Sequence, residues 1–162
     1  MRNVKLKSLL ILSVTLAVLF MTSCKKEKAL LNLDGGVEIS IKDKLGNDLL
    51  NPSTPNAFIE NEIKIYYLVD GIKKEVFNAN YDHPRNFILF EKAGEYIIGL
   101  SPNGDEKEEL PVTYIQWNAF ESDTIQCHFS RTSDSVVCDK VWYNETLVWD
   151  NYSASRSIQI VK

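Results

Sequence analysis

Short runs of alternating apolar and polar residues, separated by turn-forming residues, recur from residue 37 to the end of the chain. The first run, VEISIKD, places Val37, Ile39 and Ile41 on one face and polar residues on the other. A period of two is typical of a β-strand with one buried face. No convincing helical period follows. We therefore expect an all-β fold, an antiparallel β-sandwich in a single domain spanning residues 36–162.

Turn signals between these runs predict hairpins. In IKIYYLVDGIKKEVFN, the dipeptide Asp70-Gly71 lies between two β-rich runs, as a two-residue type I′ turn requires. The motif AGEYIIGL resembles the Ala-Gly-x-Tyr strand of immunoglobulin-like domains, in which a tyrosine, here Tyr96, ties a corner through its hydroxyl. This resemblance favours an immunoglobulin-like sandwich, with other β-sandwiches as the alternative.

A basic and then apolar segment precedes the expected domain. The apolar run LLILSVTLAVLF is shorter than the roughly 20 residues that a membrane-spanning helix needs. A basic start, a short apolar core and small residues at the exit are the parts of a bacterial secretory signal. The exit, MTSC at residues 21–24, resembles the lipobox of bacterial lipoproteins. The resemblance implies cleavage before Cys24 and lipid on Cys24, and an uncleaved anchor helix is the alternative.

These features divide the chain into a cleaved signal peptide (1–23), a lipidated flexible tether (24–35) and the β-sandwich domain (36–162). The expected membrane contact is the lipid anchor on Cys24, and stable anchoring takes more than one acyl chain. In enteric-type lipoproteins an aspartate after the cysteine retains the protein at the inner membrane, whereas Lys25 stands there in this chain. We therefore expect an envelope protein of the outer membrane, on either its periplasmic or its surface face.

The charge balance excludes one class of partner. The whole chain has a net charge of −4, and residues 1–23 contain basic but no acidic residues, so the domain by itself is more acidic still. Binding to nucleic acid requires a basic surface. We expect no nucleic-acid partner.

Two cysteines remain in the expected domain, Cys127 and Cys138. If the hairpin turn centres on Thr132-Ser133, they face each other directly, with Cα atoms about 4.5–5.5 Å apart, within the range of a disulfide. An exported protein meets an oxidising compartment, where such a pair bridges. The alternative is two buried free thiols.

Three tryptophans are candidates for stacking on a ligand. If Glu145-Thr146 is the centre of the next turn, Trp142 faces Trp149, and two neighbouring indoles can stack on a sugar ring. Trp117, in YIQWN, is the third candidate. The alternative for all three is packing in the core, or for the pair, clamping the hairpin.

Known catalytic and metal-binding motifs are absent from the sequence. It contains no Gly-x-Ser-x-Gly, HExxH or P-loop pattern. His128 follows Cys127 in a strand, so the two side chains point to opposite faces and do not share a zinc ion easily. DKLGND can hold calcium through Asp43, Asn47 and Asp48, but it lacks the EF-hand spacing, and a turn stabilised by Asx side chains is favoured. We expect no catalytic residue, no metal and no cofactor.

The segments DKLGNDLLNP, IKIYYLVDG, DTIQCHF and KVWYNETLVW, followed by a terminal IQIVK, together resemble a family of small lipoproteins from Bacteroidota-type bacteria. The similarity covers most of residues 36–162. It implies a compact β-sandwich on a lipid tether and no assigned activity. These relatives often have Asn-Gly where this chain has Asn144-Glu145. Thr124 and Ser135, each after an aspartate, also resemble the O-glycosylation sequence of that phylum.

Two hypotheses of function follow. The first is a non-enzymatic binding or structural module at the cell envelope, whose partner is a glycan, a peptide or another envelope protein. The second is a polysaccharide-acting hydrolase that uses two carboxylates brought together by the fold. The anchor, the strand pattern and the missing catalytic motifs favour the first.

Overall fold

The computed structural model describes residues 32–151 and 156–162. The predicted signal peptide and Cys24 lie outside the described residues. Apart from strands, the described chain contains one 3-10 helix, η1 (Glu60–Glu62). Among the described residues, no helix is both long enough and apolar enough to cross a membrane.

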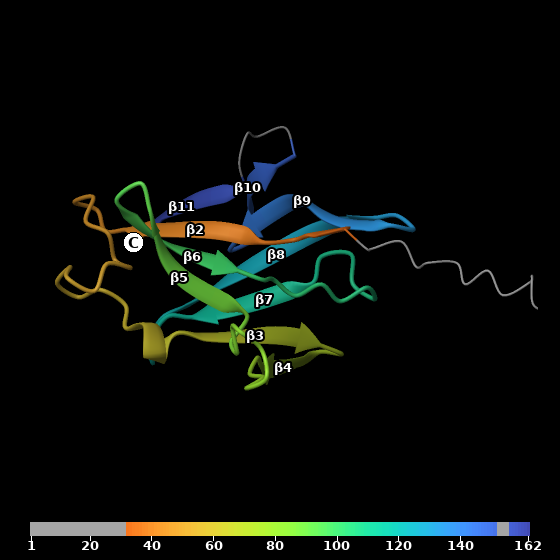
Figure 1. The fold of residues 1–162 in the computed structure, drawn as a ribbon, viewed down its shortest axis with the longest axis horizontal. Helices are drawn as coiled ribbons and strands as arrows, with labels where there is room; N and C mark the ends of the chain where they lie inside the picture. Colours follow the sequence, from red (N-terminus) through yellow and green to blue (C-terminus); the bar gives the residue numbers. More distant parts are fainter. Residues whose placement is uncertain (1–31, 152–155) are drawn as a thin grey trace, which may run out of the picture. The chain divides into compact units, whose positions relative to one another are not determined.

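The strands form two sheets that pack face to face (Figure 1). The large sheet has the order β1-β9-β8-β7-β3-β4, with β10 also beside β9. Its strands are β1 (Asn32–Asp34), β3 (Lys64–Val69), β4 (Ile72–Glu75), β7 (Val112–Gln116), β8 (Ser122–Arg131), β9 (Ser135–Tyr143) and β10 (Thr146–Asp150). The small sheet has the order β11-β2-β6-β5. Its strands are β2 (Val37–Lys42), β5 (Phe87–Lys92), β6 (Glu95–Leu100) and β11 (Ser157–Val161).

The core lies between the sheets and is built by the alternation seen in the sequence. On the small sheet Ile39 is paired with Ile98, and on the large sheet Ile65 is paired with Ile115; all four side chains are fully buried. Complete burial of one such side chain contributes about 1.5–3 kcal/mol. The predicted all-β sandwich is confirmed. The immunoglobulin-like subtype stays a prediction.

Neighbouring strands pair antiparallel, as expected, but two pairs between distant segments are parallel. β1 runs parallel to β9, and β11 runs parallel to β2. β1 lies within the predicted tether 24–35, so the last part of that segment belongs to the sheet. Arg156 fastens it there, because its guanidinium donates to both carboxylate oxygens of Asp34, at 2.7 and 3.2 Å.

The predicted turn at Asp70-Gly71 is present, and a second turn has the same chemistry. Asp70-Gly71 has positive φ at both positions (51° and 75°), and Val69 is paired with Ile72 across it, which confirms the type I′ hairpin. Ala93-Gly94 makes the same turn between β5 and β6, with φ of 54° and 84°. Tyr96, at the start of β6, packs its ring against the core. The hydroxyl that ties a backbone corner is instead that of Tyr67, which donates to Ser101 O at 2.7 Å.

The β9–β10 hairpin turns one residue earlier than predicted. Its turn is Asn144-Glu145, both with positive φ (45° and 67°), and Trp142 is paired with Leu147. The predicted pairing of Trp142 with Trp149 is therefore wrong. A bulge after Leu147 brings Trp149 opposite Val141, and this places its indole in the core while Trp142 lies on the outer face.

The register of β8 against β9 also differs from the predicted one. A bulge separates two stretches of the ladder, so Phe129 is paired with Cys138 while Cys127 is paired with Val141. The prediction that the cysteines are directly opposed is wrong. The physical reason is the extra residue in β9, which keeps both cysteines on the buried face although they are no longer opposite each other.

Candidate functional site

A hollow on the outer face of the small sheet is the main candidate site. Alternate residues of β5 and β6 face away from the core there, and Gly99 lies between Ile88 and Phe90. A Cβ atom at Gly99 would lie 3.2 Å from Ile88 Cγ2 and 3.2 Å from Phe90 Cε1. The lack of a side chain at Gly99 thus lets Ile88 and Phe90 close over the strand and leaves a shallow floor beside them.

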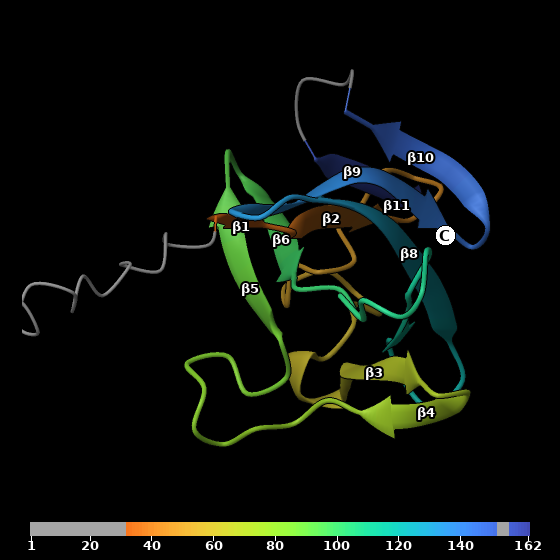
Figure 2. The ribbon, with the colours of Figure 1, turned by 90° about the vertical axis from the view of Figure 1, so that its right-hand side faces the viewer.

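The loop from β4 to β5 runs along one side of the sandwich (Figure 2), and its residues 80–83 and Asn86 line the hollow as a second wall. Three backbone hydrogen bonds close within the loop. Asn78 N donates to Pro84 O at 2.8 Å, Tyr81 N donates to Asn78 O at 3.1 Å, and Asn86 N donates to His83 O at 2.9 Å. This bonding fixes the loop without using the side chains at positions 80–83, which line the hollow.

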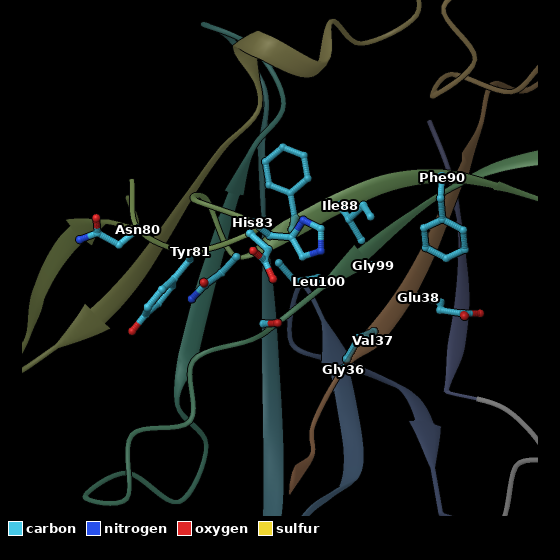
Figure 3. A pocket seen from close by; sticks show the side chains of 14 residues that line it. Gly36, Val37, Glu38, Asn80, Tyr81, His83, Ile88, Phe90, Gly99 and Leu100 are labelled. Atoms are coloured by element: carbon cyan, nitrogen blue, oxygen red, sulfur yellow. The ribbon is translucent and has the colours of Figure 1, made fainter. Parts of the chain in front are cut away.

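We call this hollow the outer groove. It has a volume of about 640 Å³ and is lined by residues 36–38, 80–83, 86–88, Phe90 and 99–101. Figure 3 shows Asn80 and Tyr81 at one end, Phe90 and Glu38 at the other, and His83 and Gly99 between them. Its volume lies within the range of about 300–1,000 Å³ that is usual for small-molecule sites.

The polar groups of the outer groove fall into two kinds. Some are already engaged: Lys92 Nζ lies 2.9 and 2.7 Å from the two carboxylate oxygens of Glu38. Others are not: among the described residues, the side chains of Asn80, Asp82 and His83 form no hydrogen bond. These three groups can therefore donate to and accept from a ligand.

A network beneath the groove holds its wall in place. Asn86 Nδ2 donates to Tyr67 Oη at 2.8 Å, and burial raises the pKa of Tyr67 despite this bond, so the hydroxyl stays protonated and donates to Ser101 O. Arg85 Nη1 donates to Glu60 O at 2.8 Å, and its guanidinium stacks over the ring of Phe87. The loop is thus tied to both the large sheet and η1.

The three candidate tryptophans lie in different environments. Trp117 is fully buried and donates from Nε1 to Asp123 at 2.5 Å, and Trp149 is 8% exposed in the core. Neither can stack on a ligand, and core packing is the correct alternative for both. Trp142 is half-buried on the outer face of the large sheet, away from the outer groove. No pair of neighbouring indoles is formed.

The DKLGND segment is a turn held by its own side chains. Asp43 Oδ1 accepts from Leu45 N and from Asn47 N, each at 2.8 Å, and Asp43 Oδ2 accepts from Asn47 Nδ2 at 2.7 Å. Asp48 accepts from Leu50 N and from Tyr96 N. The favoured interpretation, a turn stabilised by Asx side chains, is confirmed. Within the described part of the chain, no group of three or more His, Cys, Asp or Glu residues is placed to hold a metal ion.

A small polar cluster on the outer face of the large sheet was not foreseen. The bulge in β9 turns Asp139 outward, where it accepts from His128 Nδ1 at 2.5 Å and from Ser130 Oγ at 2.7 Å. Partial burial raises the pKa of Asp139, but these hydrogen bonds outweigh it and hold the pKa below its usual value. A nucleophilic triad needs histidine in the middle. Here the carboxylate of Asp139 is in the middle, so the cluster is not a nucleophilic triad. Its hydrogen bonds to His128 and Ser130 stabilise the bulge instead.

Cys127 and Cys138 are buried free thiols whose side chains meet across the bulge. The interaction with Cys138 and burial raise the pKa of Cys127, whereas the interaction with Cys127 lowers the pKa of Cys138, whose Sγ donates to Lys140 O at 3.5 Å. The positive charge of Arg156 acts on both sulfurs. The disulfide stays a prediction.

The two candidate glycosylation residues lie in strands of the large sheet. Thr124 Oγ1 donates to Asn144 Oδ1 at 3.3 Å, and Ser135 Oγ lies 2.7 Å from Thr132 Oγ1. Both side chains are half-buried. Their modification stays a prediction.

Comparisons with protein-family models, with curated proteins and with solved structures found no match for this chain. The interpretation of the site therefore depends on its own geometry.

The outer groove was missed in the sequence. The segment NANYDHPRN, residues 78–86, carried the one usable signal, because it concentrates amide, carboxylate, imidazole and phenol groups in a connection between two strands. Such loops on a rigid scaffold carry binding residues more often than strands do. The other wall comes from residues 36–38 and 99–101, which only the fold brings to the loop.

Proposed function

We propose that this chain is a non-enzymatic binding module, held at the cell envelope by lipid on Cys24, and that it binds its ligand in the outer groove. The observation that carries the proposal is the groove itself: a hollow whose lining combines unengaged polar side chains and the exposed Tyr81 with apolar residues of the small sheet. Concave sites with an apolar surface and a few convergent polar groups are typical of ligand binding.

The same geometry favours binding over hydrolysis. A glycosidase needs one protonated and one ionised carboxyl group on either side of the scissile bond. The acidic residues of the groove are Glu38 and Asp82. Both carboxylate oxygens of Glu38 are bound by Lys92 Nζ, so Glu38 is already engaged within the protein and does not form an open pair with Asp82 across the groove.

The anchor and the groove are tested separately. For the anchor, membranes of cells that express the full chain or its Cys24→Ala variant are washed with carbonate. We expect the unsubstituted chain to remain with the membranes and the variant to be released. Retention of Cys24→Ala in the membranes would refute the lipid anchor.

For the groove, the full-length protein in detergent is applied to printed arrays of glycans and of short peptides. We expect binding to one class of spot, and we expect it to be lost in Gly99→Leu, which fills the floor, and in Tyr81→Ala, which removes an exposed ring. Phe120→Ala is the matched control, because Phe120 is an aromatic residue outside the groove with 97% exposure. Binding that survives both groove substitutions, or no binding at all, contradicts the proposal.

A further inference from the structure

The two walls of the outer groove differ in chemistry: one is apolar and the other offers hydrogen-bonding groups. Ile88 and Phe90 offer apolar surface above the floor at Gly99, whereas Asn80 and Asp82 offer hydrogen-bonding groups from the loop. A ligand that fits must therefore have an apolar face and a polar edge close together. A pyranose ring has this form, with C–H groups on its faces and hydroxyl groups around its rim.

Tyr81 offers an exposed aromatic ring on which a sugar ring can stack. Its ring is 59% exposed, and the hydrogen bond from its backbone N–H to Asn78 O belongs to the rigid loop. An exposed aromatic ring on an ordered backbone offers a large contact area at a small cost in conformational entropy. Neighbouring amide and carboxylate groups, at Asn80 and Asp82, can then bind adjacent hydroxyl groups of a sugar in a bidentate manner.

The charges of the groove exclude anionic ligands. Lys92, the cation beside the groove, is committed to Glu38, and Asp82 adds a negative charge. A phosphate or a uronic acid would meet repulsion there without a counter-charge of the kind that Arg and Lys clusters supply. A purely apolar ligand would also be disfavoured, since it would bury Asn80 and Asp82 without hydrogen-bond partners.

The position of the groove on the sheet disfavours an extended peptide. Peptides that bind β-sheet domains commonly add a strand at a free sheet edge. The floor of the groove belongs to β6, which is paired with β2 on one side and with β5 on the other. The backbone of the floor at Gly99 is therefore already paired, and recognition there rests on side chains. β5, which contributes Ile88 and Phe90, is the edge strand of this sheet, so strand addition along β5 is the competing mode that the peptide probe below tests.

We infer that the outer groove binds a neutral oligosaccharide, with one sugar ring stacked on Tyr81 and its hydroxyl groups bound by Asn80 and Asp82. This inference rests on the binding function proposed above and names its ligand class. The side chain of His83, between Tyr81 and Gly99, lies where the next sugar unit would pass (Figure 3).

The test is calorimetric titration of the full-length protein, in detergent, with neutral hexasaccharides: cellohexaose, xylohexaose, mannohexaose and maltohexaose. Hexagalacturonate and a mixture of uncharged hexapeptides serve as the competing probes. We expect at least one neutral sugar to bind and the competing probes not to bind. Tyr81→Ala should weaken this binding by about tenfold, as loss of a stacking contact does, while Tyr81→Phe retains it.

Phe120→Ala should leave the affinity unchanged, and the melting temperature of each variant checks that the fold is intact. Binding of the hexapeptides alone, lost in Tyr81→Ala, overturns the sugar but leaves the binding function standing. Binding of hexagalacturonate alone overturns the neutral class in the same way. If none of the probes binds, both the sugar and the groove as a ligand site are overturned. Sugar binding that Tyr81→Ala does not change overturns the placement of the sugar in the groove.

Discussion

The indole nitrogen of Trp117 donates a hydrogen bond to the carboxylate of Asp123, and both side chains are buried. Asp123 also accepts from Asn144 Nδ2 at 2.8 Å and pairs with Lys162 Nζ at 2.8 Å. One carboxylate therefore joins the end of β7, the β9–β10 turn and the last residue of the chain. Burial raises the pKa of Asp123, but the hydrogen bonds from Lys162, Asn144 and Trp117 outweigh it and lower the pKa.

Replacing this carboxylate should destabilise the domain strongly. Asp123→Asn removes the buried carboxylate that Lys162 Nζ and Trp117 Nε1 share and leaves Glu121, at 3.2 Å, as the remaining carboxylate partner of Lys162. Because hydrogen bonds to a charged group are lost, we expect a loss of about 2 kcal/mol in the free energy of unfolding. Urea denaturation of the full chain measures it. Glu91→Gln, an exposed substitution on β5, is the control and should change the stability by less than about 0.5 kcal/mol. A similar effect in both variants would contradict the role of Asp123.

The cluster on β8 and β9 predicts a pH dependence. The pKa of Asp139 lies below its usual value of about 3.9, so the native state holds this carboxylate ionised in a range where the unfolded chain begins to bind a proton. Its stabilising effect is fully present above the unfolded value and is lost as the pH falls through the lower, folded value. We expect the free energy of unfolding to fall below about pH 4, and less steeply in Asp139→Asn. Denaturation curves between about pH 2 and pH 6 test this, and parallel curves would contradict it.

The thiol pair predicts a disulfide in protein taken from an oxidising compartment. We expect Cys127 and Cys138, denatured without reductant, to take up no alkylating reagent, and to take up two equivalents after reduction. Closing this short loop should stabilise the domain by about 3 kcal/mol in the chain-entropy model. Intact mass gives the first result, and denaturation with and without reductant gives the second. Alkylation of both thiols before reduction would refute the bridge.

The turn at Asn144-Glu145 predicts a stabilising substitution. Glu145 adopts φ of 67°, a left-handed conformation that is costly for a residue with a Cβ atom and easy for glycine. Glu145→Gly should raise the free energy of unfolding by about 1 kcal/mol, less the entropy that glycine adds to the unfolded chain. Glu145→Ala is the control, because it removes the charge but keeps the Cβ atom. Equal stabilisation by both would show that charge, and not φ, matters.

Local chemistry in the sequence determined the strands and two of the tight turns of this protein. Alternation in VEISIKD identified its buried face, and Asp70-Gly71 identified its hairpin, because both signals act over a few residues and need no distant partner. The Asx side chains of DKLGND likewise predicted the turn at residues 43–48. These features would be the same in many β-domains.

The tertiary structure decided the registers and the candidate site. A bulge cannot be read from alternation, and a slip of one residue moves a side chain to the other face of the sheet. For this reason Trp149 lies inside while Trp142 lies outside, and Cys127 is not opposite Cys138. The outer groove depends on the same kind of long-range placement, because its floor at Gly99 and its wall at Tyr81 come together only when the loop from β4 closes against a finished sheet.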